Sequence, residues 1–155
     1  MSDRRIAMRG AWLVVVSLSI SAACTGPRID SVRNDDLDGA RQALALNLVA
    51  IQRHDVEAYL AQYEESPDLA VLDADSLHLG YVIFAEARRA SDDWPDTLIP
   101  GKPTLLWIAP GVVWAAFPYT SVTAGDTSSG WSERLFLKTV GGWKIAMTGA
   151  MTRPR

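Results

Sequence analysis

The last third of the chain, residues 104–152, is an almost continuous series of strand-like segments, and this feature constrains the fold most. β-Branched and aromatic residues are frequent in these segments, and Gly141-Gly142 separates the last two, as in a tight hairpin. The predicted strands are residues 104–109, 112–123, 131–140 and 143–152. Strands joined by connections this short pair antiparallel, so this part of the chain predicts one large antiparallel sheet.

Helical patterns precede the sheet. Apolar side chains recur three and four positions apart along residues 35–53 and share one face of a predicted helix: Leu37, Ala40, Leu44, Leu48 and Ile51. Asp35 or Asp36 is expected to cap this helix, and Asp55 the next one. The other expected elements are helices at 56–65 and 80–90, a strand at 68–73 and a loop at 91–101. Helices followed by long strands indicate an α+β fold.

Alternation along the final hairpin predicts which side chains share a face of the sheet. With Val140 opposite Trp143, one face carries Arg134, Phe136, Lys138, Val140, Trp143, Ile145 and Met147. The other face carries Glu133, Leu135, Leu137, Lys144, Ala146, Thr148 and Ala150. Because both faces are partly apolar, we expect one to pack on the helices and the other on a second copy of the chain, in a homodimer.

The start of the chain is organised as an export signal. Basic residues within 1–10 precede an apolar stretch at 11–23, and small residues lead to Cys24, the only cysteine. This order resembles a bacterial lipoprotein signal peptide, which implies removal of 1–23 and lipidation of the Cys24 thiol. The alternative is ordinary cleavage after Ala23, which leaves a free thiol.

A lipid on Cys24 implies a protein that is exported and anchored in the cell envelope without a transmembrane helix. Thr25 follows the cysteine where an Asp resembles an inner-membrane retention signal, so the expected location is the outer membrane, facing the periplasm. Residues 24–34 are polar, contain Gly-Pro and predict a tether, and residues 35–155 form the expected domain.

Several short segments carry a family resemblance. His54-Asp55 joins the first two helices, DLAVLD and HLGYVIFAEA follow, and Gly142-Trp143-Lys144-Ile145 lies in the last hairpin. Across residues 35–152 the order of elements resembles the nuclear transport factor 2-like superfamily, particularly SnoaL-like and ketosteroid isomerase-like domains. The resemblance implies a cone-shaped, curved antiparallel sheet wrapped around the N-terminal helices, with a pocket inside and dimerisation through the sheet.

The resemblance also suggests where acid–base chemistry could reside. Isomerases of this superfamily use a carboxylate base on an early strand together with oxyanion donors. Asp73 is the candidate base, with Asp75 as an alternative, and His78 follows closely. The segment VVWAAFPYT, where a second acid is expected, contains no carboxylate, which counts against isomerase chemistry.

A second set of candidates could line a binding pocket. The aromatic side chains of Tyr59, Tyr63, Trp107 and Trp114 form either such a pocket or part of the core. Arg134 shares a predicted face with bulky apolar residues, and a buried cation there needs a partner. The partners considered are Glu86, Glu133 and the carboxylate of a ligand, and the alternative is an edge arginine in water.

Charge and composition exclude some function classes. The formal net charge of −3 argues against general nucleic-acid binding, and the sequence predicts neither a metal site nor a cofactor. The favoured hypothesis is a membrane-tethered, non-catalytic domain that binds a small apolar or weakly acidic molecule or dimerises. The alternatives are an isomerase, cyclase or dehydratase using Asp73, and a protein-interaction module with a filled pocket.

Overall fold

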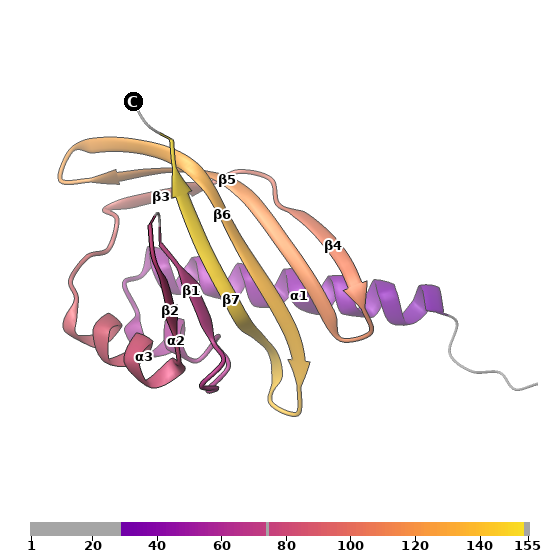
Figure 1. The fold of residues 1–155 in the computed structure, drawn as a ribbon. Helices are drawn as coiled ribbons and strands as arrows, with labels where there is room; N and C mark the ends of the chain where they lie inside the picture. The colour runs from indigo at the N-terminus through magenta and orange to yellow at the C-terminus, as the bar shows by residue number, and fades with distance from the viewer. Residues whose placement is uncertain (1–28, 74, 154–155) are drawn as a thin grey trace, which may run out of the picture.

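The computed structural model describes residues 29–73 and 75–153 (Figure 1). The predicted signal peptide and Cys24 lie outside these residues. The helices are α1 (Ile29–Gln52), α2 (Val56–Leu60) and α3 (Tyr81–Ala90). The strands are β1 (Ala70–Leu72), β2 (Leu77–Leu79), β3 (Thr97–Pro100), β4 (Thr104–Ala109), β5 (Val112–Thr123), β6 (Asp126–Thr139) and β7 (Gly142–Thr152).

The strands form one curved, open sheet in the order β2-β1-β7-β6-β5-β3, and β4 also pairs with β5. The long β5 pairs with β4 along its first half and with β3 along its second half. All pairs are antiparallel except β1 and β7, which run parallel. The predicted α+β class, with a curved antiparallel sheet around N-terminal helices, is confirmed.

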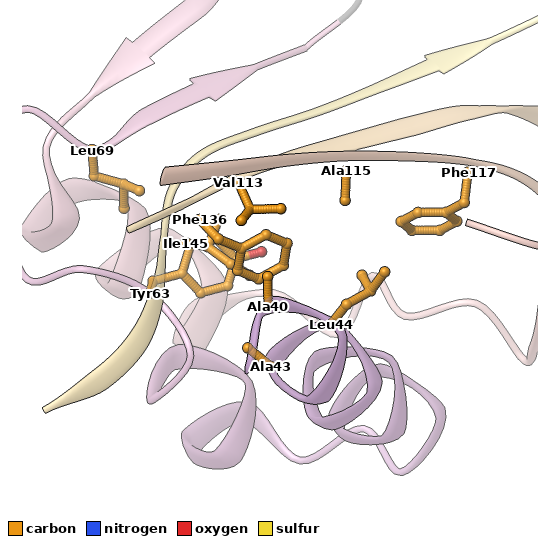
Figure 2. Close-up of a cluster of buried hydrophobic side chains, with 10 residues drawn as sticks. All are labelled: Ala40, Ala43, Leu44, Tyr63, Leu69, Val113, Ala115, Phe117, Phe136 and Ile145. Carbon is orange, nitrogen blue, oxygen red and sulfur yellow. The ribbon is translucent and has the colours of Figure 1, made fainter. Parts of the chain in front are cut away.

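Helix α1 crosses one face of the sheet, and the main core lies between them (Figures 1 and 2). Three small or medium-sized side chains of the helix, Ala40, Ala43 and Leu44, point toward the sheet. The sheet contributes Val113, Ala115, Phe117, Phe136 and Ile145 to the same cluster. We call this the concave face, and the opposite side the outer face.

Helix α1 differs from its prediction in its start and in its buried face. It begins at Ile29 instead of residue 35, so residues 29–34 of the predicted tether are helical. Its buried side chains are Asp36, Ala40, Ala43, Leu44, Asn47 and Ala50. The helix packs on the sheet through small side chains such as Ala40 and Ala43, so its backbone lies close to the sheet. Leu37 and Leu48 do not share this central position and are only partly buried. Asp35 and Asp36 both lie inside the helix, so the predicted cap at either residue is wrong, and Asp36 is a core residue.

Short elements account for most other differences. Strands β2 and β3 were not predicted, and α2 ends at Leu60, earlier than expected. The Asp55 cap is confirmed, since its carboxylate accepts a hydrogen bond of 3.0 Å from the Ala58 backbone N–H. The bounds of β4 and β5 are as predicted.

The final hairpin follows the predicted alternation as far as a β-bulge. Trp143 pairs with Lys138 and not with Val140, so the predicted pairing is wrong by two residues. A shift of two residues keeps the faces, and Phe136 and Ile145 face α1 as expected. The register then shifts between Leu135 and Phe136, which inserts one extra residue on β7. Past this point the predicted faces of β7 are wrong: Met147 lies opposite Leu135 on the outer face, and Thr148 lies opposite Arg134 on the concave face.

Candidate functional site

A row of four side chains crosses the concave face from its centre to its edge. Arg134 on β6 pairs with Thr148 on β7, which pairs with Val71 on β1, which pairs with His78 on β2. Directly paired residues point to the same side of a sheet, so all four share the face that α1 covers. Neighbouring strands lie about 4.8 Å apart, which places Arg134 roughly 10 Å from Val71 across the sheet.

The edge of this row opens into a hollow of about 490 Å³ between the sheet and α3. The sheet side contributes Val71, Asp73 and His78, and α3 contributes Phe84 and Arg88. A volume of this size falls within the range of about 300–1,000 Å³ that small-molecule sites have. The outer end of the row is therefore accessible, and its inner end is Arg134.

Arg134 is 5% exposed, so the predicted alternative of an edge arginine in water is wrong. Its Nη1 donates to the Ser132 hydroxyl at 2.6 Å and to the Glu133 backbone carbonyl at 2.7 Å. The guanidinium carbon lies 5.8 Å from the centre of the Phe117 ring. These contacts are all with neutral groups, and they hold the Arg134 guanidinium inside the cone.

Neither of the protein carboxylates considered for Arg134 pairs with it. The Glu133 carboxylate accepts a hydrogen bond of 3.1 Å from Trp114 Nε1, and Glu86 is an exposed residue of α3. Among residues 29–73 and 75–153, no carboxylate lies within 4.0 Å of the Arg134 guanidinium.

Aromatic side chains from α2, α3 and the segments that follow these helices cover the row. The hydroxyl of Tyr63 donates to that of Tyr59 at 2.5 Å, and the Phe84 ring lies 4.7 Å from the Tyr63 ring. Trp94 meets Tyr59 edge-on at 5.4 Å. Burial is the main cause that raises the pKa of Tyr59 well above 10.0, while the charges of Arg134 and Arg88 act in the opposite direction. The Tyr59 hydroxyl thus keeps its proton.

Arg88 is a second cation beside this cluster. Its guanidinium stacks 4.1 Å from the centre of the Trp94 ring, and Nη2 donates to the backbone carbonyl of Ser91 at 3.1 Å. Arg88 was not among the predicted site residues, since a basic residue in the last turn of a helix is ordinary there.

Asp73 and His78 come together at the mouth of the hollow. His78 Nε2 lies 3.2 Å from the Asp73 carboxylate and 3.1 Å from the Ser76 hydroxyl. Both side chains are more than half exposed. The two catalytic candidates are thus neighbours, in a place that water reaches freely.

The four aromatic candidates separate in the structure. Tyr59 and Tyr63 cover the row, but Trp107 donates its indole N–H to buried Asp36 at 3.1 Å and supports α1. Trp114 pairs with Leu135 on the outer face, so it does not belong with Arg134. The sequence could not separate them because each fits an alternating strand or helix pattern equally well.

Buried polar atoms without a hydrogen-bond partner mark the interior. Among the described residues these atoms are Nδ2 and Oδ1 of Asn47, Nε of Arg88 and Nε of Arg134. Asn47 is 0% exposed on the face of α1 that packs on the sheet. An amide within the apolar stripe of a helix is a signal that sequence reasoning could have used, because burial of an unpaired polar group is costly.

Residues 29–73 and 75–153 contain neither a cluster of metal-ligating side chains nor a membrane-spanning helix. No three side chains among His, Cys, Asp and Glu come together there in a way that could hold a metal ion. No helix within those ranges has both the length and the apolar character needed to cross a bilayer.

Solved structures include many with the same arrangement of helices and sheet. One is a nuclear transport factor 2-like protein of unknown function from Shewanella oneidensis MR-1, with a TM-score of 0.64, 19% identity, and 73% of this chain and 96% of that chain covered. Another, from Novosphingobium aromaticivorans, is described as a proposed scytalone dehydratase, with a TM-score of 0.66, 10% identity, and coverage of 81% and 89%. The chain has the nuclear transport factor 2-like fold.

Other similarities within this fold point to different activities. A protein from Parabacteroides distasonis, described as a proposed ketosteroid isomerase, matches with a TM-score of 0.62, 14% identity, and coverage of 71% of this chain and 84% of that chain. No protein-family model and no curated protein sequence matches the chain. The nuclear transport factor 2-like fold hosts isomerases, dehydratases and proteins of unknown function, so the site must decide the function.

Proposed function

We propose that the protein is a membrane-tethered, non-catalytic domain of the cell envelope that binds a small apolar or weakly acidic molecule on the concave face. One observation carries the proposal: half-buried Arg88 lines an open, partly apolar hollow with a buried Nε that lacks a hydrogen-bond partner, and buried Arg134, further in along the same row, also has an unpaired Nε. Buried polar groups are normally satisfied, and a ligand that reaches from the hollow to Arg134 would supply the missing partners of both guanidinium groups.

The test obstructs the hollow without disturbing the core. Ala87 lines the hollow on α3 and is exposed, so Ala87→Trp places an indole in the opening. We expect the purified protein to bind two-ring aromatic molecules such as 2-naphthoate and methyl 2-naphthoate with saturable heats in titration calorimetry. Ala87→Trp should weaken that binding by about tenfold or more, as displaced apolar contact area predicts.

Ala90→Trp is the matched control. Ala90 is also exposed on α3 but does not line the hollow, and the substitution adds the same bulk. It should bind the two-ring probes like the unaltered protein. Equal effects of the two substitutions, or no binding by the unaltered protein, would contradict the proposed site.

Acid–base catalysis is the second candidate function, because Asp73 and His78 contact each other at the hollow. Their exposure disfavours it, since water competes there with a substrate for the proton. We expect Asp73→Asn to change the affinity for 2-naphthoate by less than about twofold, and no turnover of a ketosteroid by either form. An isomerase or dehydratase activity that Asp73→Asn abolishes, with folding intact, would put the enzyme first.

The membrane tether rests on the sequence alone. We propose that Cys24 is the acylated N-terminus of the mature protein, since basic, apolar and small residues precede it in the order of a lipoprotein signal. Mass spectrometry of the protein from its native membrane should find lipid on Cys24 and no residues 1–23. An unmodified thiol at that position would refute the anchor.

We further propose that the outer face pairs two copies of the chain. Its exposed apolar side chains are Leu72, Leu77, Leu79, Leu106, Trp131 and Met151. Apolar patches of this extent favour association. Sedimentation should give twice the monomer mass, and a strict monomer at high micromolar concentration would reject the dimer.

A further inference from the structure

The guanidinium of Arg134 uses its donors unevenly. Nη1 accounts for every hydrogen bond of this side chain, with the Ser132 hydroxyl, the Glu133 carbonyl and the Gly149 carbonyl as acceptors. Nε is buried without a partner, and Nη2 makes no hydrogen bond in the described part of the chain. These two nitrogens form one edge of the planar group.

The same edge is engaged in another arginine of this protein. Arg89 donates from Nε to one carboxylate oxygen of Glu57 at 2.7 Å and from Nη2 to the other at 2.9 Å. This side-on, two-bond geometry is the arrangement in which a guanidinium recognises a carboxylate most specifically. Arg134 presents the same pair of donors inside the cone.

We propose that Arg134 makes the site selective for a monocarboxylic acid with an elongated apolar body. The carboxylate lies side-on against the Nε–Nη2 edge, and the body runs past Thr148 and Val71 into the hollow beside α3. This inference rests on the proposed function and names the class of ligand that the site takes.

The surroundings of Arg134 favour a single negative charge. The guanidinium is 5% exposed and touches only neutral groups, so a bound carboxylate leaves no excess charge in the interior. The neutral hydroxyl of Tyr59 accepts its hydrogen bond from Tyr63, which leaves its own O–H to donate. A carboxylate therefore meets two guanidinium donors, with a hydroxyl donor in the same aromatic cluster.

The geometry of the row explains why the body must be elongated. Arg134 and Val71 are separated by two strand spacings, roughly 10 Å, before the hollow begins. A short acid such as acetate can contact the guanidinium, but it leaves most of the space between Arg134 and Val71 empty. It therefore gains little affinity from burial of apolar surface. A two-ring aromatic acid or a short fatty acid spans it.

The first arm of the test varies the ligand and leaves the protein unaltered. Titration calorimetry compares 2-naphthoate, its methyl ester and 2-naphthalenesulfonate. We expect the carboxylate to bind about tenfold or more tightly than the ester, which corresponds to a charge-assisted hydrogen-bond pair. The sulfonate should bind more weakly than the carboxylate, because its oxygens are much weaker hydrogen-bond acceptors and its third oxygen adds bulk beside the guanidinium.

The second arm varies the arginine. Arg134→Gln should abolish the preference for acid over ester, and Arg134→Lys should restore only part of it, because an ammonium cannot make the two parallel bonds. Arg89→Gln is the matched control, since that arginine is paired with Glu57 and lies outside the cone. It should leave the preference unchanged.

The outcomes separate this inference from the proposed function. Equal affinities for acid and ester, both weakened by Ala87→Trp, would overturn carboxylate selectivity and leave small-molecule binding standing. A sulfonate that binds as tightly as the carboxylate would also overturn it, because charge alone would then decide. Binding of none of the three probes would overturn both proposals. The ligand series keeps the test decisive even if Arg134→Gln fails to fold.

Discussion

Replacing Phe136 with Ala should lower the free energy of unfolding by about 3–5 kcal/mol, the usual cost of deleting a buried phenylalanine ring. The ring is 0% exposed and lies at the centre of the cluster that joins α1 to the sheet (Figure 2). It sits opposite Val113 on one neighbouring strand and Ile145 on the other. Rigid strands on both sides prevent the structure from closing over the cavity.

Urea unfolding followed by circular dichroism measures this change. Val140→Ala is the matched control, because that side chain lies at the hairpin tip close by in the sequence and is fully exposed. Its effect should stay within about 0.5 kcal/mol. A loss of less than about 1 kcal/mol for Phe136→Ala would mean that the ring does not fill the core.

The second large effect is expected at Asp36, the buried carboxylate of α1. It is 1% exposed and accepts hydrogen bonds from the Gly111 backbone N–H at 2.7 Å and from Trp107 Nε1 at 3.1 Å. Lys138 lies 3.4 Å away. Asp36→Ala leaves both donors unpaired, so we expect it to lower the free energy of unfolding by about 2–4 kcal/mol.

This contribution should depend on pH. Burial alone raises the pKa of the Asp36 carboxyl, but the hydrogen bonds from Gly111, Trp107 and Lys138 outweigh it and hold the pKa below 3.8. A carboxyl with a lowered pKa stabilises the fold fully above its unfolded pKa and loses that effect as pH falls through the folded value. The difference between the unaltered protein and Asp36→Asn should thus be constant near neutral pH and shrink below about pH 4.

Asp38→Ala is the control for the acid measurements. Asp38 lies on the exposed side of α1 and, among the described residues, forms its ion pair with Arg41, three residues later. A surface pair of this kind contributes about 0–1 kcal/mol. A pH-independent difference at Asp36, or an equal loss at Asp38, would contradict the assigned role.

The strands at the centre of the sheet and the first helix could be predicted because their patterns are long. The six residues of β4 alternate between exposed and half-buried positions, β5 is a run of twelve residues rich in strand-forming types, and both strands had the expected bounds. Strands β2 and β3 have three and four residues, too few for alternation to stand out, and β3 ends in a proline. These short strands are fixed by pairing with distant partners, which a local pattern does not contain.

The site was predictable only in part, for the same reason. The alternation along β6 correctly predicted that Arg134 and Phe136 share a face of the sheet, because both residues lie on one strand. Its neighbour Thr148 was placed on the wrong face, since a single bulge on β7 reverses every later side chain. Phe84 and Arg88 reach the row from a helix far away in the sequence, and nothing local indicates that.

The division of the outer strand into β3 and β4 also bears on how the protein avoids polymerising. An open sheet exposes unpaired backbone groups along its two edges, and a long straight edge invites a strand from another molecule. Here one edge is β2, only three residues long, and the other is broken between β3 and β4. Pro100 and Pro103 flank that break and donate no backbone hydrogen bond. Fibril-like growth from either edge is thereby discouraged, although the sheet never closes into a barrel.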